Sequence, residues 1–269
     1  MTTSTTSTTS AFGAELRRWR TARRHSQLDL AALADVSQRH LSHLETGRSR
    51  PSREMVTRLA EALDVPLRGH NEMLAAAGFA AAHDHRSLHD ADMDRVRAIL
   101  QRVLDGHEPA PAYVVDRHWD LVLANAATAR LTGMLPNPER AAAAGRGNVL
   151  RLLLHPDGLA PHVVNLGEVA AVLLGRLRRE TAEHGGDEQL AGLLEEMTAL
   201  APAEVPTSPP SERDLVVPLH LDLGGHRLRL LTMIATIGAA HDVTVEELRL
   251  ETLLPMDEET RDVLAAENS

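Results

Sequence analysis

Residues 26–52, "SQLDLAALADVSQRHLSHLETGRSRPS", contain the pattern that decides the fold of the N-terminal part. Ser26 is expected to cap a helix that ends near Ala34. A second helix is expected from about Ser37 to Gly47, where glycine is typical of a helix C-terminus. Two short helices separated by a few residues predict a helix-turn-helix.

The second of these helices has few apolar residues. Leu41 and Leu44 form the stripe that it must bury against its neighbours. The side chains left to point outward are Gln38, Arg39, Ser42 and His43. This outer face is suited either to hydrogen bonding with a ligand or simply to solvation, and the pattern alone leaves both interpretations open.

The flanking sequence continues the same helical reading over residues 11–80. Phe12, Leu16 and Trp19 recur at helical spacing before the motif. Pro51-Ser52 opens a third helix after it, and Pro66 starts one more. The run "MTTSTTSTTS" at residues 1–10 is expected to be a disordered polar tail, because it has no apolar residue to bury after Met1.

Charge is unevenly distributed along the 269 residues, whose net charge is −10. Residues 1–80 hold 11 arginines against 8 acidic residues, which gives +3, and the remainder carries −13. The overall charge argues against a general polyanion binder. We expect only the N-terminal part to meet a polyanion.

The chain has no cysteine, which excludes disulfides, thiolate metal sites and a redox thiol. This composition fits a reducing cytosol, and we expect a cytoplasmic protein. No apolar run approaches the roughly 18–20 residues that a membrane span needs. The N-terminus lacks the basic and apolar regions of a secretory signal.

The C-terminal part mixes strand and helix patterns, so the chain is expected to be α+β overall. Residues 112–125 are β-rich on both sides of a turn, and residues 219–230 alternate apolar and polar side chains around Gly224-Gly225, as in a two-residue hairpin. Helices are expected near 163–200 and at 257–267. Residues 135–148, rich in Pro, Ala and Gly, are expected to be a loop.

Enzyme and metal interpretations have little support. Neither G-x-S-x-G nor H-E-x-x-H occurs. The histidines of "HDHRSLH", residues 83–89, could chelate a metal, but a solvated linker is the favoured reading. "HPDGLAPH", residues 155–162, has the Pro-Asp-Gly of a turn. We therefore expect no enzyme activity, no metal and no cofactor.

Residues 26–79 resemble the lambda-repressor-like, xenobiotic-response-element (XRE) family of helix-turn-helix proteins. The resemblance is carried by Ser26-Gln27, Leu30-Ala31, Val36-Ser37, Leu41, Leu44-Glu45, Gly47 and Arg50-Pro51-Ser52. Asp35 stands where the family turn usually has glycine, but aspartate tolerates a left-handed backbone better than most residues. The resemblance implies a domain that binds double-stranded operator DNA.

The resemblance also implies roles for individual side chains. Ser37, Gln38 and Arg39 open the recognition helix, where arginine can bond guanine and glutamine adenine. Gln27 lies at a helix N-terminus, which suits a phosphate. The remaining candidates for base or phosphate contacts are Ser42, His43, Thr46, Arg48 and Arg50.

Residues from about 93 to the end resemble the MmyB-like ligand-binding domain, which follows helix-turn-helix domains of this type. Runs such as "PAYVVDRHWDLVLANAATARL" and "ATIGAAHDVTVEELRLETLLPMDEET" carry the resemblance. It implies a PAS-like fold, in which a small antiparallel sheet cups a pocket for a small hydrophobic molecule such as a fatty acid. Polar residues amid apolar runs are the candidate pocket residues: Trp119, Asn125, His155 and Asn165. Asn125 and Asn165 can equally be helix caps.

These observations predict a transcriptional regulator with a tail at 1–10, a DNA-binding domain at 11–80, a linker and connecting helix at 81–108 and a ligand-binding domain at 109–269. Such modules usually bind DNA as dimers, so a homodimer is expected. The apolar stripe of the connecting helix, Val96, Leu100 and Val103, could meet its symmetry mate. The alternative is a regulator whose C-terminal domain only dimerises or docks a protein.

Overall fold

The computed structural model of the chain describes residues 4–183, 187–202 and 216–266, and for residues 4–10 only the backbone. It divides into two compact units. The first comprises residues 1–86 and 238–246, and the second residues 87–237 and 247–269. Each unit is described below on its own.

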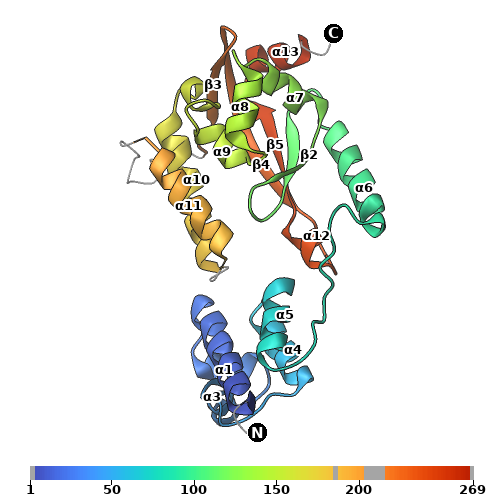
Figure 1. Cartoon of the computed structure of the whole chain (residues 1–269), viewed down its shortest axis with the longest axis vertical. Coiled ribbons are helices and arrows are strands. Elements are labelled where there is room, and N and C mark those ends of the chain that lie inside the picture. The colour runs from blue at the N-terminus through green and yellow to red at the C-terminus, as the bar shows by residue number, and fades with distance from the viewer. Residues whose placement is uncertain (1–3, 184–186, 203–215, 267–269) are drawn as a thin grey trace. The chain divides into compact units, whose positions relative to one another are not determined.

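The first unit is a bundle of five helices (Figure 1). They are α1 (Ser4–Ala22), α2 (Gln27–Leu33), α3 (Gln38–Glu45), α4 (Arg53–Ala62) and α5 (Leu67–Ala76). Ser26, Ser37 and Ser52 cap α2, α3 and α4 as their side chains accept a backbone N–H three residues on. These starts confirm the predicted helices. Helix α1 begins at Ser4, inside the expected disordered tail, since no Gly or Pro there stops the helix.

Helices α1 to α5 enclose one apolar core. Its fully buried side chains include Phe12, Leu16, Leu30, Leu41, Leu44, Val56, Leu59 and Met73. Asp35, in the turn between α2 and α3, has a φ of 51°, so the expectation of a left-handed residue is confirmed. The turn lets Leu41 and Leu44 of α3 face the core, and it leaves the opposite face of α3 outside.

The first unit also contains residues 238–246, which connect β4 to β5 of the second unit. The Val243 N–H donates to the Asp84 carbonyl over 2.9 Å. The Leu67 N–H, at the start of α5, donates to the Glu246 carboxylate over 2.8 Å. A helix start leaves its first N–H groups without an intrahelical acceptor, and Glu246 supplies one.

The second unit is built on a five-stranded antiparallel sheet. The strands are β1 (Ala112–Val115), β2 (Leu121–Ala124), β3 (Leu219–Leu223), β4 (His226–Thr236) and β5 (Arg249–Pro255), in the order β2-β1-β5-β4-β3. The predicted hairpin is confirmed, with Leu223 opposite His226 and a positive φ at Gly224 and Gly225. A small antiparallel sheet flanked by helices agrees with the α+β, PAS-like expectation.

Helices cover both faces of this sheet (Figure 1). The helices of this unit are α6 (Asp94–Asp105), α7 (Ala126–Gly133), α8 (Pro138–Gly145), α9 (Val149–Leu154), α10 (Leu166–Glu183), α11 (Glu188–Leu200) and α13 (Glu258–Ala266), with short 3-10 turns at Ala91–Met93 and Ala160–His162. Helix α11 packs on α9 and α10 rather than on the sheet. The short helix α12 (Val243–Glu247) precedes β5 and lies almost entirely in residues 238–246, which belong to the first unit. Leu100 and Leu104 of α6 pack against Ala112 and Val114 of β1. The stripe of α6 is therefore buried mainly within its own unit, although Val103 stays largely exposed.

The prediction of a loop over residues 135–148 is wrong, because α8 occupies most of this stretch. Asn137 caps this helix by accepting the Arg140 N–H, and Pro138 takes the first helical position, where proline is favoured. The four alanines at 141–144 that follow are strong helix formers. Proline and glycine here mark the two ends of a helix, and the composition of the stretch concealed it.

No helix among the residues that the structure describes is both long and apolar enough to span a membrane.

Candidate functional site

Helix α3 separates its buried and exposed side chains clearly. Leu41 and Leu44 have no exposed surface, whereas Gln38 and Arg39 are exposed. The Ser37 hydroxyl accepts the His40 N–H over 3.1 Å and so fixes the start of the helix. The polar face of α3 is thus held rigidly by a cap and two core leucines, and it is free to meet another molecule.

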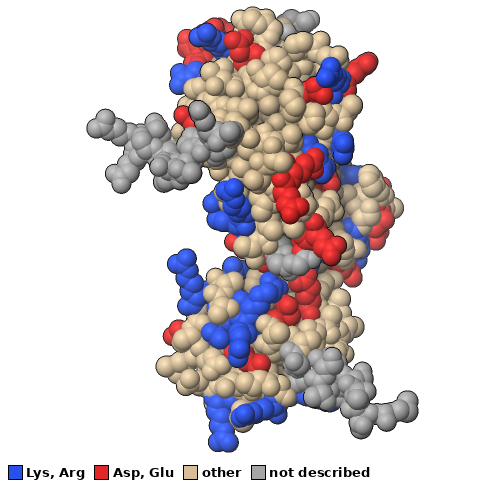
Figure 2. All heavy atoms as spheres, turned by 60° about the vertical axis from the view of Figure 1, so that its left-hand side comes forward, with Lys and Arg blue, Asp and Glu red and all other residues tan. Residues whose placement is uncertain are grey.

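Three arginines lie on α3 or in the segment directly after it. Arg39, Arg48 and Arg50 are exposed, and within the described part of the chain none of their guanidinium groups makes a hydrogen bond or ion pair. Arginine side chains project from the surface of this bundle in Figure 2. Guanidinium groups without internal partners are available for guanine edges or phosphates.

The arginines of α1 and Arg23, which directly follows this helix, are used differently. Arg18 pairs with Glu15, and the Arg23 guanidinium donates to the carbonyls of Leu63 and Asp64. Arg20 donates to Glu45 at the end of α3. These three arginines therefore stabilise the bundle through contacts within it.

Other predicted DNA contacts are partly engaged within the bundle. The Gln27 amide donates to Glu45 over 2.8 Å, which leaves its second N–H for a phosphate. The Thr46 hydroxyl donates to the Ser42 carbonyl over 2.7 Å. The His43 side chain is half-buried. DNA contacts by these four residues remain predictions.

Glu45 is a buried carboxylate that joins α1, α2 and α3. Burial alone would raise the pKa of Glu45, but hydrogen bonds from Arg20 and Gln27 and the charges of Arg20 and Arg17 outweigh burial and lower it. Glu45 is therefore ionised in the folded bundle. Its contacts fix the orientation of α3 relative to α1.

The second unit holds a charge network between α10 and the sheet, made of Tyr113, Arg176, Glu180, Arg249 and Glu251. Arg176 Nη1 donates to Glu251 over 2.9 Å, and the Tyr113 hydroxyl donates to the same carboxylate over 3.0 Å. Arg176 and Arg249 both donate to Glu180. Burial, together with Glu251, raises the pKa of Tyr113 well above its ordinary range, so the phenol stays protonated.

Trp119 is the one predicted ligand residue that joins this network. Its indole N–H donates to Glu180 over 2.8 Å. The guanidinium carbons of Arg176 and Arg249 lie 4.2 and 4.7 Å from the ring centroids, so two cations contact the indole. Trp119 has a φ of 68°, which is unusual for a bulky residue and marks a strained turn.

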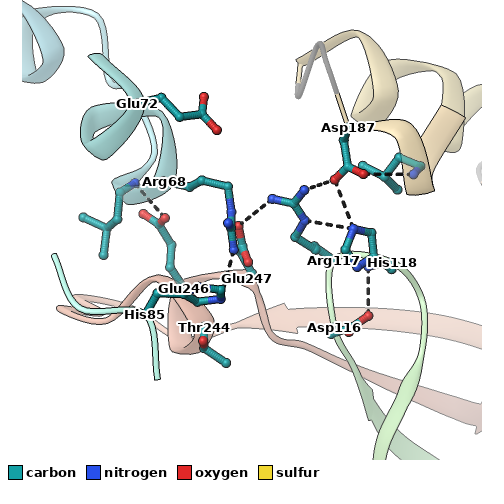
Figure 3. A network of polar contacts seen from close by, with 12 residues as sticks. Arg68, Glu72, His85, Asp116, Arg117, His118, Asp187, Thr244, Glu246 and Glu247 are labelled. Carbon is teal, nitrogen blue, oxygen red and sulfur yellow. Dashed lines mark hydrogen bonds and ion pairs between the residues drawn. The ribbon is translucent and has the colours of Figure 1, made fainter. Parts of the chain in front are cut away.

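A second polar cluster holds this turn (Figure 3). Arg117 pairs with Asp187, which caps α11, and with Glu247. His118 Nε2 lies 3.0 Å from the Asp187 carboxylate. Burial and the neighbouring Arg117 lower the pKa of His118. The cluster fixes the turn between β1 and β2, and so the position of Trp119.

The other predicted ligand residues lie elsewhere. Asn125 is buried, caps α7 and binds the Ala110 carbonyl. The Asn165 amide donates to the Pro218 carbonyl and accepts the His220 N–H, which ties α10 to β3. His155 Nδ1 accepts the Asp157 N–H in a turn. The structure does not bring these three side chains together, and their role in ligand binding stays a prediction.

The network residues were not predicted from the sequence. Arg249 and Glu251 are separated by one position, so they point to the same face of β5, and this strand has a buried centre. Two opposite charges on one face of a buried strand are the signal that could have identified them. Their partners Arg176 and Glu180 are distant in sequence, and only the fold brings them near.

Apolar surface is left uncovered beside the network. Ile234 lies opposite Glu251 in the sheet register and is 46% exposed. Val172, one turn before Arg176 on α10, is 43% exposed. A separate shallow groove of about 590 Å³ lies between α10 and α11, with Arg178 and Leu194 in its lining.

The described residues hold no group of three His, Asp or Glu side chains that could bind a metal ion. Of the linker histidines, His83 Nε2 lies 3.0 Å from His70 Nδ1.

A helix-turn-helix bundle with a capped, exposed polar helix and free arginines, followed by an α+β sheet unit, is the architecture of a DNA-binding regulator with a second domain. The MmyB-like transcription regulator ligand binding domain matches residues 96–266, and a helix-turn-helix domain matches residues 11–72. The chain therefore belongs to the family of MmyB-like transcription regulators. None of the curated proteins compared with it matches the chain.

Proposed function

We propose that this regulator binds a specific operator as a homodimer and that its ligand is a small aliphatic molecule with a polar head, of which fatty acids are the leading candidates. The observation that supports operator binding is the exposed Arg39 on the first turn of α3, whose guanidinium has no partner among the described residues. The proposal includes a cytoplasmic location. The proposal includes no catalytic step.

We assign recognition of the DNA base sequence to the start of α3. Helix N-terminal side chains reach the floor of the major groove in helix-turn-helix proteins. Arg39 is placed to bond guanine in a bidentate manner, and Gln38 to bond adenine. Arg48 and Arg50 follow α3 in an exposed segment, which suits backbone phosphates.

Ligand binding is assigned to the surface between α10 and the sheet. Val172 and Ile234 offer apolar contact for an alkyl chain. The Nε of Arg249 is buried and has no acceptor among the described residues. A buried donor without a partner costs free energy, and a ligand oxygen would satisfy it. This combination supports an amphipathic ligand.

The ligand proposal is tested by mass spectrometry of an organic extract of the purified full chain, followed by titration with saturated fatty acids of increasing length. Val172→Trp should fill the apolar surface and reduce binding at least tenfold. Leu121→Trp, at an exposed position on β2, is the matched control and should bind like wild type. Equal binding by all three proteins would place the ligand elsewhere.

If neither the extract nor the titration yields a ligand, an alternative function is the better candidate. The C-terminal unit would then serve to dimerise or to dock a protein, as the exposed apolar residues of its strands also permit.

A ligand that regulates must change the affinity for DNA, and the coupling must be reciprocal. Typical coupling corresponds to a change of roughly 5- to 150-fold in operator affinity. Two elements connect the units covalently and are candidates to carry it: the segment leading into α6, and residues 238–246 between β4 and β5. Operator titrations with and without bound ligand measure the coupling directly.

A further inference from the structure

Strand β4 is longer than the strand that covers its outer edge. β3 pairs with β4 only as far as Leu230, which lies opposite Leu219. Beyond that point, Leu231 to Thr236 pair with β5 alone. Among the described residues nothing hydrogen-bonds to the other edge of this segment, so a notch of six residues is open next to β3.

The direction of the main-chain groups in this notch follows from the ladder. The Met256 N–H, directly after β5, donates to the Arg229 carbonyl over 2.9 Å, so the polar groups of Arg229 point to the β5 side. Both polar groups of a residue in an antiparallel strand point the same way, and the direction alternates along the strand. The N–H and C=O groups of Thr232, Ile234 and Thr236 therefore point out of the open edge.

The notch lacks the features that keep edge strands apart. Natural edges are protected by charged side chains, proline or bulges. The stretch from Leu230 to Ala240, "LLTMIATIGAA", contains no charged residue and no proline, although the chain beyond residue 80 carries a net charge of −13. An uncharged segment in such an acidic part of the chain is one where two copies can approach without direct charge repulsion.

The exposed side chains of the notch point to both faces of the sheet. Met233 is 54% exposed and Ile234 is 46% exposed, and neighbouring residues of a strand point to opposite faces. A ligand on one face could cover only Ile234. An added strand would extend both faces and contact both side chains.

We propose that this open edge pairs, antiparallel, with the same edge of a second copy, so that β4 joins the two sheets. The inference rests on the proposed homodimer and names its surface. With Ile234 opposite its own symmetry mate, Thr232 faces Thr236 of the second copy, and the three outward-pointing residues form up to six hydrogen bonds. Other registers lose pairs or run into the position that β3 already occupies.

The two-fold register also matches like with like. Threonine meets threonine on either side of a central isoleucine pair, and cross-strand pairs of threonines or of β-branched residues stabilise sheets. No like charges meet. The self-complementary order Thr-x-Ile-x-Thr favours a second copy of this chain over an unrelated strand.

The test uses the absence of cysteine in the full chain. In the proposed register, residue 234 lies about 5.5 Å from its mate between Cα atoms, a separation that a disulfide spans. Ile234→Cys, oxidised at low protein concentration, should give a covalent dimer in most of the chains. Leu121→Cys, on the strand at the other end of the sheet, is the matched control and should remain monomeric on non-reducing gels.

A second variant checks the interface without a cross-link. Ile234→Lys should convert a dimer, measured by sedimentation at about ten micromolar, to a monomer and leave the thermal midpoint within a few degrees. Absence of the cross-link from an Ile234→Cys protein that sediments as a dimer, or a monomeric wild-type chain, would overturn the proposal. Operator binding that persists without the cross-link would leave the proposed function standing. A cross-linked chain that selects no DNA sequence would support the edge and refute the function.

Discussion

The guanidinium of Arg20 on α1 donates to the buried carboxylate of Glu45, the last residue of α3, with 2.6 Å between Nε and Oε1. The partner is not a surface charge, because the Glu45 side chain has no exposed area. This ion pair, with the Gln27 amide as a third member, connects the recognition helix to the rest of the bundle. The orientation of the face proposed to read DNA thus depends on a carboxylate that is buried inside the bundle.

Glu45→Gln should lower the stability of the bundle by on the order of 1–3 kcal/mol at neutral pH, because the hydrogen bonds of a charged acceptor are weakened. The folded pKa of Glu45 lies below its ordinary value, so its contribution is complete above that value and is lost as the pH falls through the folded pKa. Thermal unfolding followed by circular dichroism should show the difference between the two proteins narrowing in acid. A constant difference would exclude this role. Glu15→Gln, which removes the more exposed ion pair with Arg18 on α1, is the control.

Gly13→Ala should destabilise the bundle, because α1 approaches the end of α3 at this residue. A Cβ on Gly13 would lie 2.5 Å from the Glu45 carbonyl oxygen and 2.8 Å from that of Leu44. Such overpacking costs about 1–3 kcal/mol. Gly192→Ala on α11 meets no atom within 4 Å and should instead stabilise its helix by up to about 1 kcal/mol. Denaturant unfolding of both variants measures the contrast, and equal effects would contradict the packing argument.

Asp242→Ala should loosen residues 238–246 within the first unit. The Asp242 carboxylate accepts the N–H groups of Thr244 and Arg86, and it is buried. Loss of such a capping acceptor costs about 1–2 kcal/mol. Hydrogen exchange should speed up in peptides that cover residues 84–86 and 242–246. Asp84→Ala removes a nearby but exposed carboxylate and should leave the exchange of α12 unchanged.

The helix-turn-helix was predictable because its determinants are local. Ser26, Ser37 and Ser52 cap helices a few residues away, and Asp35 adopts the left-handed turn that its residue type allows. The hairpin at Gly224-Gly225 was predictable for the same reason. Short-range chemistry decides each of these elements, and it is visible in the sequence itself.

The charge network could not be predicted, because its members come from separate parts of the chain. Arg176 and Glu251 are 75 residues apart and meet only after α10 packs on the sheet. The membership of residues 238–246 in the first unit depends equally on long-range contacts, such as the one from Leu67 to Glu246, 179 residues apart. Helix α8 was missed for a local reason, since its Pro and Gly suggested a loop.

Arg48→Ala should weaken binding to specific and random duplexes alike. Its exposed guanidinium, after the end of α3, is assigned to a phosphate. Each lost phosphate contact should reduce the slope of log affinity against log salt by about 0.9. Fluorescence anisotropy at four salt concentrations measures the slope. An unchanged slope would remove Arg48 from the phosphate contacts.

The central claim is that α3 reads DNA sequence through Arg39, and one comparison tests it most directly. An operator is selected from random duplexes with the wild-type chain, and the affinities of wild type and Arg39→Ala are then measured for that operator and for random DNA at one salt concentration. Loss of the guanine contact should cost about 1–3 kcal/mol on the operator and relax the preference at one base position, with a much smaller effect on random DNA. An equal loss on both duplexes, with no change in base preference, would contradict the account.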